Sequence, residues 1–184
     1  MRPAIFLDRD GVIIENCEAY VRSWDDVSFI PAALEALRAV SRSDWAIVIA
    51  TNQAAVGKGI ITLELAHQIN QRVVTEVVRC GGRIDAAYLC PHRPDECCDC
   101  RKPKPGMLLR AAHDLGLDLS RSVMIGDAIT DMEAARAAGV RGILVMTGRG
   151  LSEWCAFADT PWFDVADDLA CAVELLAPIE RIVR

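Results

Sequence analysis

Ile-Phe-Leu-Asp-Arg-Asp-Gly-Val, residues 5–12, is an apolar run that ends in two aspartates and a glycine. A short apolar run of this kind is typical of a buried strand in a parallel sheet. In open α/β sheets, ligands bind beyond the carboxyl ends of the strands, which is where Asp8 and Asp10 would lie. Because Gly11 lets the backbone turn away, we expect the chain to leave the strand near Asp8. The two carboxylates would then converge on one point.

Two carboxylates this close repel each other and lose hydration when they are buried, so they need a cation or a proton nearby. The segment alone allows two interpretations. One is a helix N-cap followed by a turn aspartate. The other is a magnesium site with one nucleophilic aspartate and one acid/base. The second gains support if further carboxylates and a phosphate-binding lysine follow later strands.

The composition is that of a globular protein, and it leaves a small phosphate ligand possible as the partner. The chain has 184 residues, 52% hydrophobic and 25% charged, with a net charge of -6. The acidic balance and the lack of a basic block disfavour nucleic acid, and no apolar run is long enough to span a membrane. A predicted strand begins close to Met1, so we expect no signal peptide and a cytoplasmic protein. In that compartment the eight cysteines favour metal ligands or free thiols over disulfides.

Predicted strands and helices alternate along the whole chain. This order predicts one α/β domain, residues 1–184, with a Rossmann-like parallel sheet and helices on both faces. Residues 57–59 are expected to form a mobile loop, and residues 149–161 show the least pattern. The strands are expected at residues 5–8, 46–50, 84–89, 122–125, 142–146 and 162–165, and the helices at residues 32–40, 63–80, 106–115, 129–138 and 169–176.

Polar side chains gather where successive strands or the loops after them end. They are Asp8 and Asp10, Thr51 and Asn52, Arg101 and Lys102, and Asp127 and Asp131. Phosphoryl transfer explains this convergence. Asp8 and Asp127 can bind Mg²⁺, which prefers oxygen ligands. Lys102 can neutralise phosphate charge, and Thr51 can donate a hydrogen bond to it.

A second metal site is predicted in the cysteine-rich loop. Cys90-Pro-His92 and Cys98-Asp-Cys100 supply three thiolates and one imidazole, the ligand set of a closed structural zinc site. The alternative, free cysteines in a loop, leaves a short segment without apolar residues and with nothing to fold it. Cys97 could replace Cys98 as the third ligand, although Cys98 preserves the Cys-x-Cys spacing.

Four of these motifs, in this order, resemble those of the haloacid dehalogenase (HAD) superfamily of phosphatases. They are Asp-Arg-Asp-Gly at 8–11, Thr-Asn-Gln at 51–53, Lys102, and Gly-Asp-Ala-Ile-Thr-Asp at 126–131. The resemblance implies the HAD fold, with Asp8 as the nucleophile and Asp10 as the general acid/base. It also implies that Thr51 and Lys102 hold the transferring phosphoryl group. Magnesium would be bound by Asp8, the backbone carbonyl of Asp10, and Asp127.

The resemblance leaves the role of Asp131 open. It implies an acid just outside the direct metal ligands. A carboxylate in the first turn of a helix is also favoured there for its own sake. Direct contact with the metal is the other alternative.

The zinc loop that runs into Cys-Arg-Lys-Pro at 100–103 resembles one branch of the superfamily. This branch contains the heptose 1,7-bisphosphate 7-phosphatases, the closer likeness, and the histidinol-phosphate phosphatases. It implies a small phosphorylated sugar as the partner, and we expect a monomer. The motif intervals leave no room for a large cap domain, so the zinc loop and a flap at residues 14–28 would select the substrate. By the same resemblance the substrate contacts are Asn16, Tyr20, Thr51, Asn52, Gln53, Arg101 and Lys102.

The sequence allows two alternatives to the heptose phosphatase function. The first is the histidinol-phosphate phosphatase of the same branch, or another small sugar-phosphate phosphatase. The second is a zinc-bearing scaffold without catalytic activity. An intact acid/base at Asp10 argues against a scaffold, which has no need of one.

Overall fold

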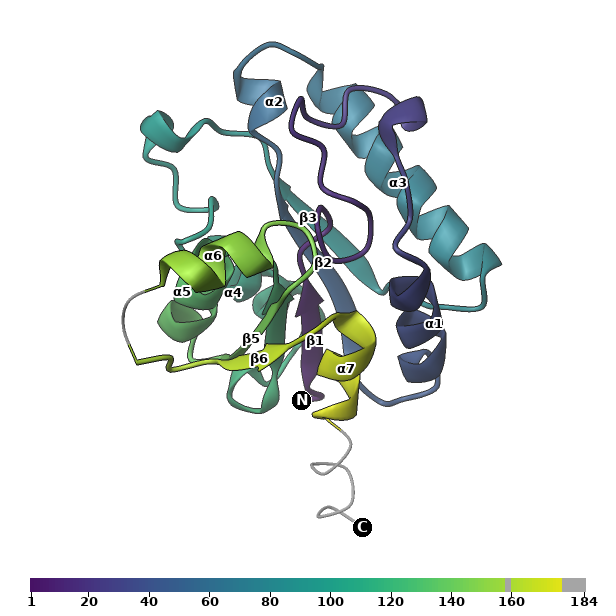
Figure 1. The fold of residues 1–184 in the computed structure, drawn as a ribbon, viewed down its shortest axis with the longest axis vertical. Helices are drawn as coiled ribbons and strands as arrows, with labels where there is room; N and C mark the ends of the chain where they lie inside the picture. Colours follow the sequence, from purple (N-terminus) through teal and green to yellow (C-terminus); the bar gives the residue numbers. More distant parts are fainter. Residues whose placement is uncertain (158–159, 177–184) are drawn as a thin grey trace.

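The strands form one parallel sheet of six, in the order β3-β2-β1-β4-β5-β6 (Figure 1). The computed structural model describes residues 1–157 and 160–176 of the chain. The predicted α/β class with a Rossmann-like sheet is confirmed. The strands are β1 (Ala4–Leu7), β2 (Ala46–Asn52), β3 (Ala86–Cys90), β4 (Val123–Gly126), β5 (Arg141–Val145) and β6 (Asp164–Ala166).

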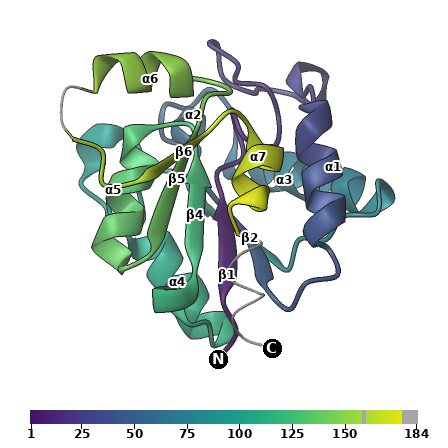
Figure 2. The same ribbon diagram turned by 60° about the horizontal axis from the view of Figure 1, so that its bottom comes forward.

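Helices cover both faces of the sheet because successive strand residues point to opposite sides. In β1, Ile5 and Leu7 pack against α1, α3 and α7, whereas Ala4 and Phe6 pack on the side of α4 and α5. Figure 2 shows these two groups of helices on either side of the strands. The α-helices are α1 (Pro31–Val40), α2 (Ala54–Gly57), α3 (Leu63–Arg79), α4 (Gly106–Leu115), α5 (Ile129–Ala138), α6 (Gly150–Ala156) and α7 (Leu169–Glu174).

Local sequence signals set several helix ends where they were predicted. Pro31 occupies the first position of α1, where its missing N–H costs nothing. The Thr62 hydroxyl accepts a hydrogen bond from the N–H of Leu65 and caps α3. Gly116 ends α4 in the left-handed conformation. These signals act within a few residues, so they can be recognised in the sequence before the fold is known.

Some element predictions were wrong in position or kind. Lys58 and Gly59 lie in a turn as expected, but the short helix α2 before them, which includes Gly57, was not predicted, and the segment of least pattern contains α6. Edge strand β3 and the short β6 lie about two residues later than expected, because strand bounds depend on partners that a sequence does not show. The last helix was expected to reach Leu176, but α7 ends at Glu174. No described helix is long and apolar enough to cross a bilayer.

The strand order places the polar residues at one edge of the sheet. β1 lies between β2 and β4, and all three run in the same direction. The loops that leave their carboxyl ends therefore meet in one region, the usual ligand position of an open α/β sheet. Residues far apart in the sequence, such as Asp8 and Asp127, are brought together by this arrangement.

Candidate active site

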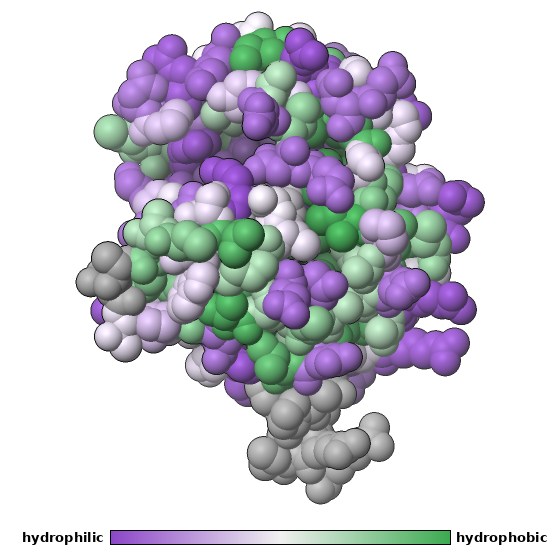
Figure 3. Space-filling model, viewed as in Figure 1, coloured by the Kyte–Doolittle hydropathy of each residue, from purple (hydrophilic) through white to green (hydrophobic). Residues whose placement is uncertain are grey.

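A cleft of about 610 Å³ opens above the carboxyl ends of the central strands. In Figure 3, hydrophilic side chains gather over the upper part of the molecule, where α2 and the loop after β3 lie in Figure 1. The cleft brings together most of the residues that the sequence singled out. Its lining includes Asp8, Asp10, Asn16, Tyr20, Asn52, Gln53, Arg101, Lys102 and Asp131, all predicted, and Lys58 and Arg149, which were not.

Lys102 is the central cation of the site. Its ammonium lies 3.1 Å from Asp8 Oδ1 and 2.6 Å from Asp131 Oδ1, and its side chain is 1% exposed. Burial works against the charge, but Asp131 and Asp8 outweigh it and raise the pKa of Lys102 above its usual range. Lys102 is therefore charged at neutral pH and can neutralise an anion placed beside Asp8.

Asn52 fixes the loop that carries Lys102. Its side-chain amide donates to the carbonyl of Lys102 at 3.0 Å and accepts from the backbone N–H of Lys102 at 3.1 Å. This paired contact holds a loop residue against the end of β2. Asn52 thus positions the lysine, and its predicted contact with substrate stays a prediction.

Asp127 lies at the end of β4 and is completely buried. Its Oδ2 accepts the backbone N–H of Arg149 at 2.9 Å, and the Arg149 guanidinium lies 3.6 Å away. Burial, with the negative charges of Asp8 and Asp131, raises the pKa of Asp127 to about 7. Among the described residues, its buried Oδ1 has no hydrogen-bond partner. A carboxylate oxygen in this position is suited to a cation.

Asp8, Asp127 and Asp131 form a buried acidic cluster whose carboxylate oxygens lie within 4.8 Å of one another. Hard oxygen donors of this kind fit Mg²⁺. Asp131 also accepts the N–H of Ala128 at the start of α5. Burial raises the pKa of Asp131 to about 6, with Lys102 opposing the shift. Asp131 therefore lies both at a helix N-terminus and in the acidic cluster, so its three possible roles stay open.

The carboxylate of Asp10 does not join this cluster, although Asp8 and Asp10 line the same cleft as expected. The guanidinium of Arg9 binds Asp10 instead, with Nη2 2.9 Å from each carboxylate oxygen. Gln53 donates to Asp10 Oδ2 at 2.7 Å and to Thr51 Oγ1 at 2.9 Å. Asp10 thus lines the cleft beside Asp8 but is held by its own cation. Its backbone carbonyl stays a predicted metal ligand.

The flap crosses the cleft and contacts the segment after α2. Tyr20, in the left-handed backbone conformation, accepts a hydrogen bond of 2.6 Å from the ammonium of Lys58. The same ammonium lies 5.1 Å from the centre of the tyrosine ring. Asn16 is exposed on the same flap. Because Lys58 was assigned to a mobile loop, its contact with the flap was missed.

The cysteine-rich loop brings four metal-ligating side chains together. Cys90, His92, Cys98 and Cys100 present atoms within 4.8 Å of one another, and the Sγ atoms of Cys90 and Cys100 are 3.1 Å apart. Cys97 is exposed and lies in the left-handed conformation, outside this group. The choice of Cys98 over Cys97 thus matches the geometry. Three sulfurs and one nitrogen form a donor set that fits zinc.

Residues 147–150 form a part of the site that the sequence did not reveal. Thr147 Oγ1 donates to the carbonyl of Gly11 at 2.6 Å, which ties the end of β5 to the turn after β1. A side chain at Gly148 would place its Cβ 2.4 Å from Asp127 Oδ2. Gly148 also has a φ of +57°, so glycine is required for both reasons. The Thr-Gly-Arg-Gly run was the available signal, since glycines near a strand end often mark a close approach.

Comparison with known proteins agrees with this geometry. A HAD-hydrolase-like family model matches residues 99–172. A D-glycero-β-D-manno-heptose-1,7-bisphosphate 7-phosphatase of Pseudomonas aeruginosa is 40% identical over 82% of this chain and 84% of its own length. The D-glycero-D-manno-heptose-1,7-bisphosphate 7-phosphatase of Thermosynechococcus vestitus is 38% identical over 94% of each chain.

A solved structure shares the architecture along nearly the whole chain. It is the crystal structure of the D,D-heptose 1,7-bisphosphate phosphatase of Bordetella bronchiseptica, complexed with magnesium and phosphate. The TM-score is 0.90 at 35% identity, over 97% of this chain and 99% of that one. Identity of this size over most of both chains shows common family membership. The chain therefore belongs to the D-glycero-D-manno-heptose-1,7-bisphosphate 7-phosphatase family of HAD-like hydrolases.

Proposed function

We propose that this chain is a magnesium-dependent phosphatase that removes the 7-phosphate of D-glycero-D-manno-heptose 1,7-bisphosphate. One observation carries the chemistry: Asp8, a member of the acidic cluster, faces the buried ammonium of Lys102 at the end of the central strand. The names of the relatives supply the substrate. The magnesium in the Bordetella structure supports the same metal here.

In the proposed first step Asp8 is the nucleophile. Its Oδ1 accepts the N–H of Arg9 at 2.7 Å and pairs with Lys102, which directs Oδ2 to the incoming phosphorus. Bond formation from Asp8 to phosphorus breaks the bond between phosphorus and the sugar oxygen. The leaving oxygen takes the proton of the Asp10 carboxyl. Mg²⁺ bound by Asp8, Asp127 and the carbonyl of Asp10 supplies charge stabilisation on the phosphoryl oxygens.

The second step hydrolyses the aspartyl-phosphate. Asp10, now ionised, takes a proton from water as the water oxygen attacks phosphorus. The bond between phosphorus and Asp8 breaks, and phosphate and the free carboxylate of Asp8 are released. Lys102 and the hydroxyl of Thr51 hold the phosphoryl oxygens through both steps, so neither has to be repositioned between them.

A bisphosphate also needs positive charge away from the reacting phosphoryl group. Lys58, Arg101 and Arg149 line the same cleft and supply it. Arg101 donates to the carbonyl of His92 at 3.1 Å, which joins the substrate arginine to the cysteine-rich loop. We therefore assign the second phosphate to these side chains.

Phosphate release from a substrate panel tests the proposal. We expect the highest kcat/KM with heptose 1,7-bisphosphate, and loss of activity when a chelator removes Mg²⁺. Histidinol phosphate and simple hexose phosphates serve as competitors at matched concentration. Preference for histidinol phosphate would replace the heptose with the alternative substrate. Absence of phosphatase activity in magnesium with every substrate would reject the enzyme.

The cysteine-rich cluster is proposed to hold a structural zinc ion. Burial raises the pKa of Cys90 and of Cys100, so both favour the thiol unless a cation stabilises the thiolates. The loop has no hydrophobic core of its own, since residues 93–97 are all exposed. Zinc binding would supply its folding free energy and hold Arg101 and Lys102 in place.

Cys100→Ser is expected to lower zinc content from one equivalent per chain and to raise KM by about tenfold, because misplaced cations cost binding energy. Metal analysis of the purified protein measures the first effect and steady-state kinetics the second. Cys97→Ser is the matched control and should retain both zinc and KM. A wild-type protein that carries no zinc under reducing conditions, or a Cys97 variant that loses it, contradicts this assignment.

A further inference from the structure

Arg9 lies between the two motif aspartates, yet its side chain is only 1% exposed. All three guanidinium nitrogens have partners on the protein. Nε and Nη2 bind Asp10, and Nη1 donates to Asn70 Oδ1 at 2.6 Å. A guanidinium that is buried and bonded to the protein through all three nitrogens is unavailable for direct contact with a substrate.

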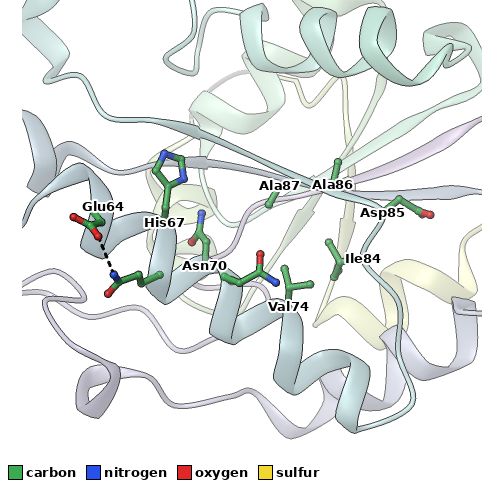
Figure 4. A pocket seen from close by; sticks show the side chains of 10 residues that line it. Glu64, His67, Asn70, Val74, Ile84, Asp85, Ala86 and Ala87 are labelled. Carbon is green, nitrogen blue, oxygen red and sulfur yellow. Dashed lines mark hydrogen bonds between the residues drawn. The ribbon is translucent and has the colours of Figure 1, made fainter.

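Asn70 is the residue that accepts the hydrogen bond from Arg9 Nη1. It lies on the buried side of α3 and is 4% exposed. Figure 4 shows it among the residues that line the groove between α3 and β3. Polar residues buried on a helix face lose hydration, and Asn70 regains a hydrogen bond through Arg9. Asn70 is absent from the lining of the cleft, so it would act on the site only through another residue.

We propose that Asn70 is a positioning residue for Asp10 and acts through Arg9. The guanidinium is planar and rigid, so the bond to Asn70 fixes the plane in which Arg9 presents Nε and Nη2. That plane sets where the Asp10 carboxylate lies. The inference rests on the proposed role of Asp10 as the acid/base of this phosphatase.

Two residues hold the carboxylate of Asp10. It is 22% exposed, and its side-chain partners are Arg9 and Gln53. Gln53 shares its amide between Asp10 Oδ2 and Thr51 Oγ1, whereas Arg9 binds both carboxylate oxygens. Arg9 is therefore the main support, and Arg9 itself is anchored by Asn70. Acid/base catalysis needs the carboxyl within hydrogen-bond reach of the leaving oxygen, which makes small displacements costly.

The test compares Asn70→Leu with Asn70→Asp on two substrates. Leucine keeps the branched shape of the side chain but removes the acceptor, whereas aspartate keeps an oxygen for Arg9 Nη1. We expect Asn70→Leu to lower kcat on the sugar phosphate about 10- to 100-fold with KM within about twofold of wild type. Asn70→Asp should restore most of this loss. His67→Leu, an exposed change one turn earlier on α3 in the same groove, is the control and should retain wild-type kinetics.

The second substrate, p-nitrophenyl phosphate, separates positioning from a general structural defect. Its leaving group departs without a proton, so phosphorylation of Asp8 depends far less on Asp10. Asn70→Leu should therefore reduce kcat/KM for the sugar phosphate much more than for the nitrophenyl ester, as Asp10→Asn should. An equal loss on both substrates, or no loss of kcat at all, overturns the inference. Wild-type turnover in the same series shows separately whether the proposed function holds.

Discussion

Asp8→Asn is expected to lower the rate of phosphate release roughly 10⁴-fold or more, as loss of a catalytic nucleophile does in other enzymes. The amide keeps the shape of the side chain but loses the attacking charge. The fold should survive, because Lys102 keeps its ion pair with Asp131. Steady-state assays in saturating Mg²⁺ measure the activity, and thermal unfolding measures the stability.

A covalent readout strengthens this test. Acid-quenched wild-type protein incubated with substrate should carry a base-labile phosphate detectable by mass, and the Asn variant should carry none. Asp25→Asn, a change on the 3₁₀ turn near the end of the flap, is a matched control that should leave turnover and labelling intact. Turnover of the Asp8 variant within a few-fold of wild type would refute the aspartyl-phosphate mechanism.

Lys102→Met should cause both loss of turnover and a large loss of stability. Methionine approximates the shape of the lysine stem but leaves Asp8 and Asp131 without their shared cation. Removal of one partner from a buried ion pair typically costs about 3–5 kcal/mol. The cost should grow from pH 5 to pH 8. Folding raises the pKa of Asp131 to about 6, so the folded state binds this proton more tightly than the unfolded state does. The free energy of unfolding therefore falls as the pH rises.

Urea unfolding at the two pH values measures this effect, in buffer without Mg²⁺. The double variant Lys102→Met with Asp131→Asn removes the cation and one of the two carboxylates together. It should recover much of the stability while remaining inactive, which separates the structural role of Lys102 from its role toward phosphate. Equal destabilisation at pH 5 and pH 8 would show that unpaired charge is not the cause.

The fold was predictable because its signals are local. Alternating apolar strands and capped helices specify a parallel sheet, and Thr62 and Pro31 set helix starts through contacts within a few residues. The carboxyl ends of such strands meet at one edge, so the sequence alone was enough to group Asp8, Lys102 and Asp127. The candidate zinc ligands were also predictable, because they lie close together in the sequence.

The rest depends on contacts between distant segments. Arg149 contacts Asp127 only because the chain after β5 returns over the end of β4. Arg9, which binds the carboxylate of Asp10, also donates a hydrogen bond from Nη1 to Asn70 on α3, 61 residues away in the sequence. Neither partner stands out in the sequence, where Asn70 is one polar residue of an amphipathic helix. Side-chain orientation at a strand end is decided by such partners.

The loop of residues 93–97 has an evolutionary consequence. These side chains are exposed, and the buried clusters on both faces of the sheet include none of them. Selection can therefore lengthen, shorten or substitute this segment without disturbing the core, provided that the four candidate metal ligands remain. New substrates could be acquired by drift in one short surface segment, while the residues that transfer phosphate are inherited unchanged.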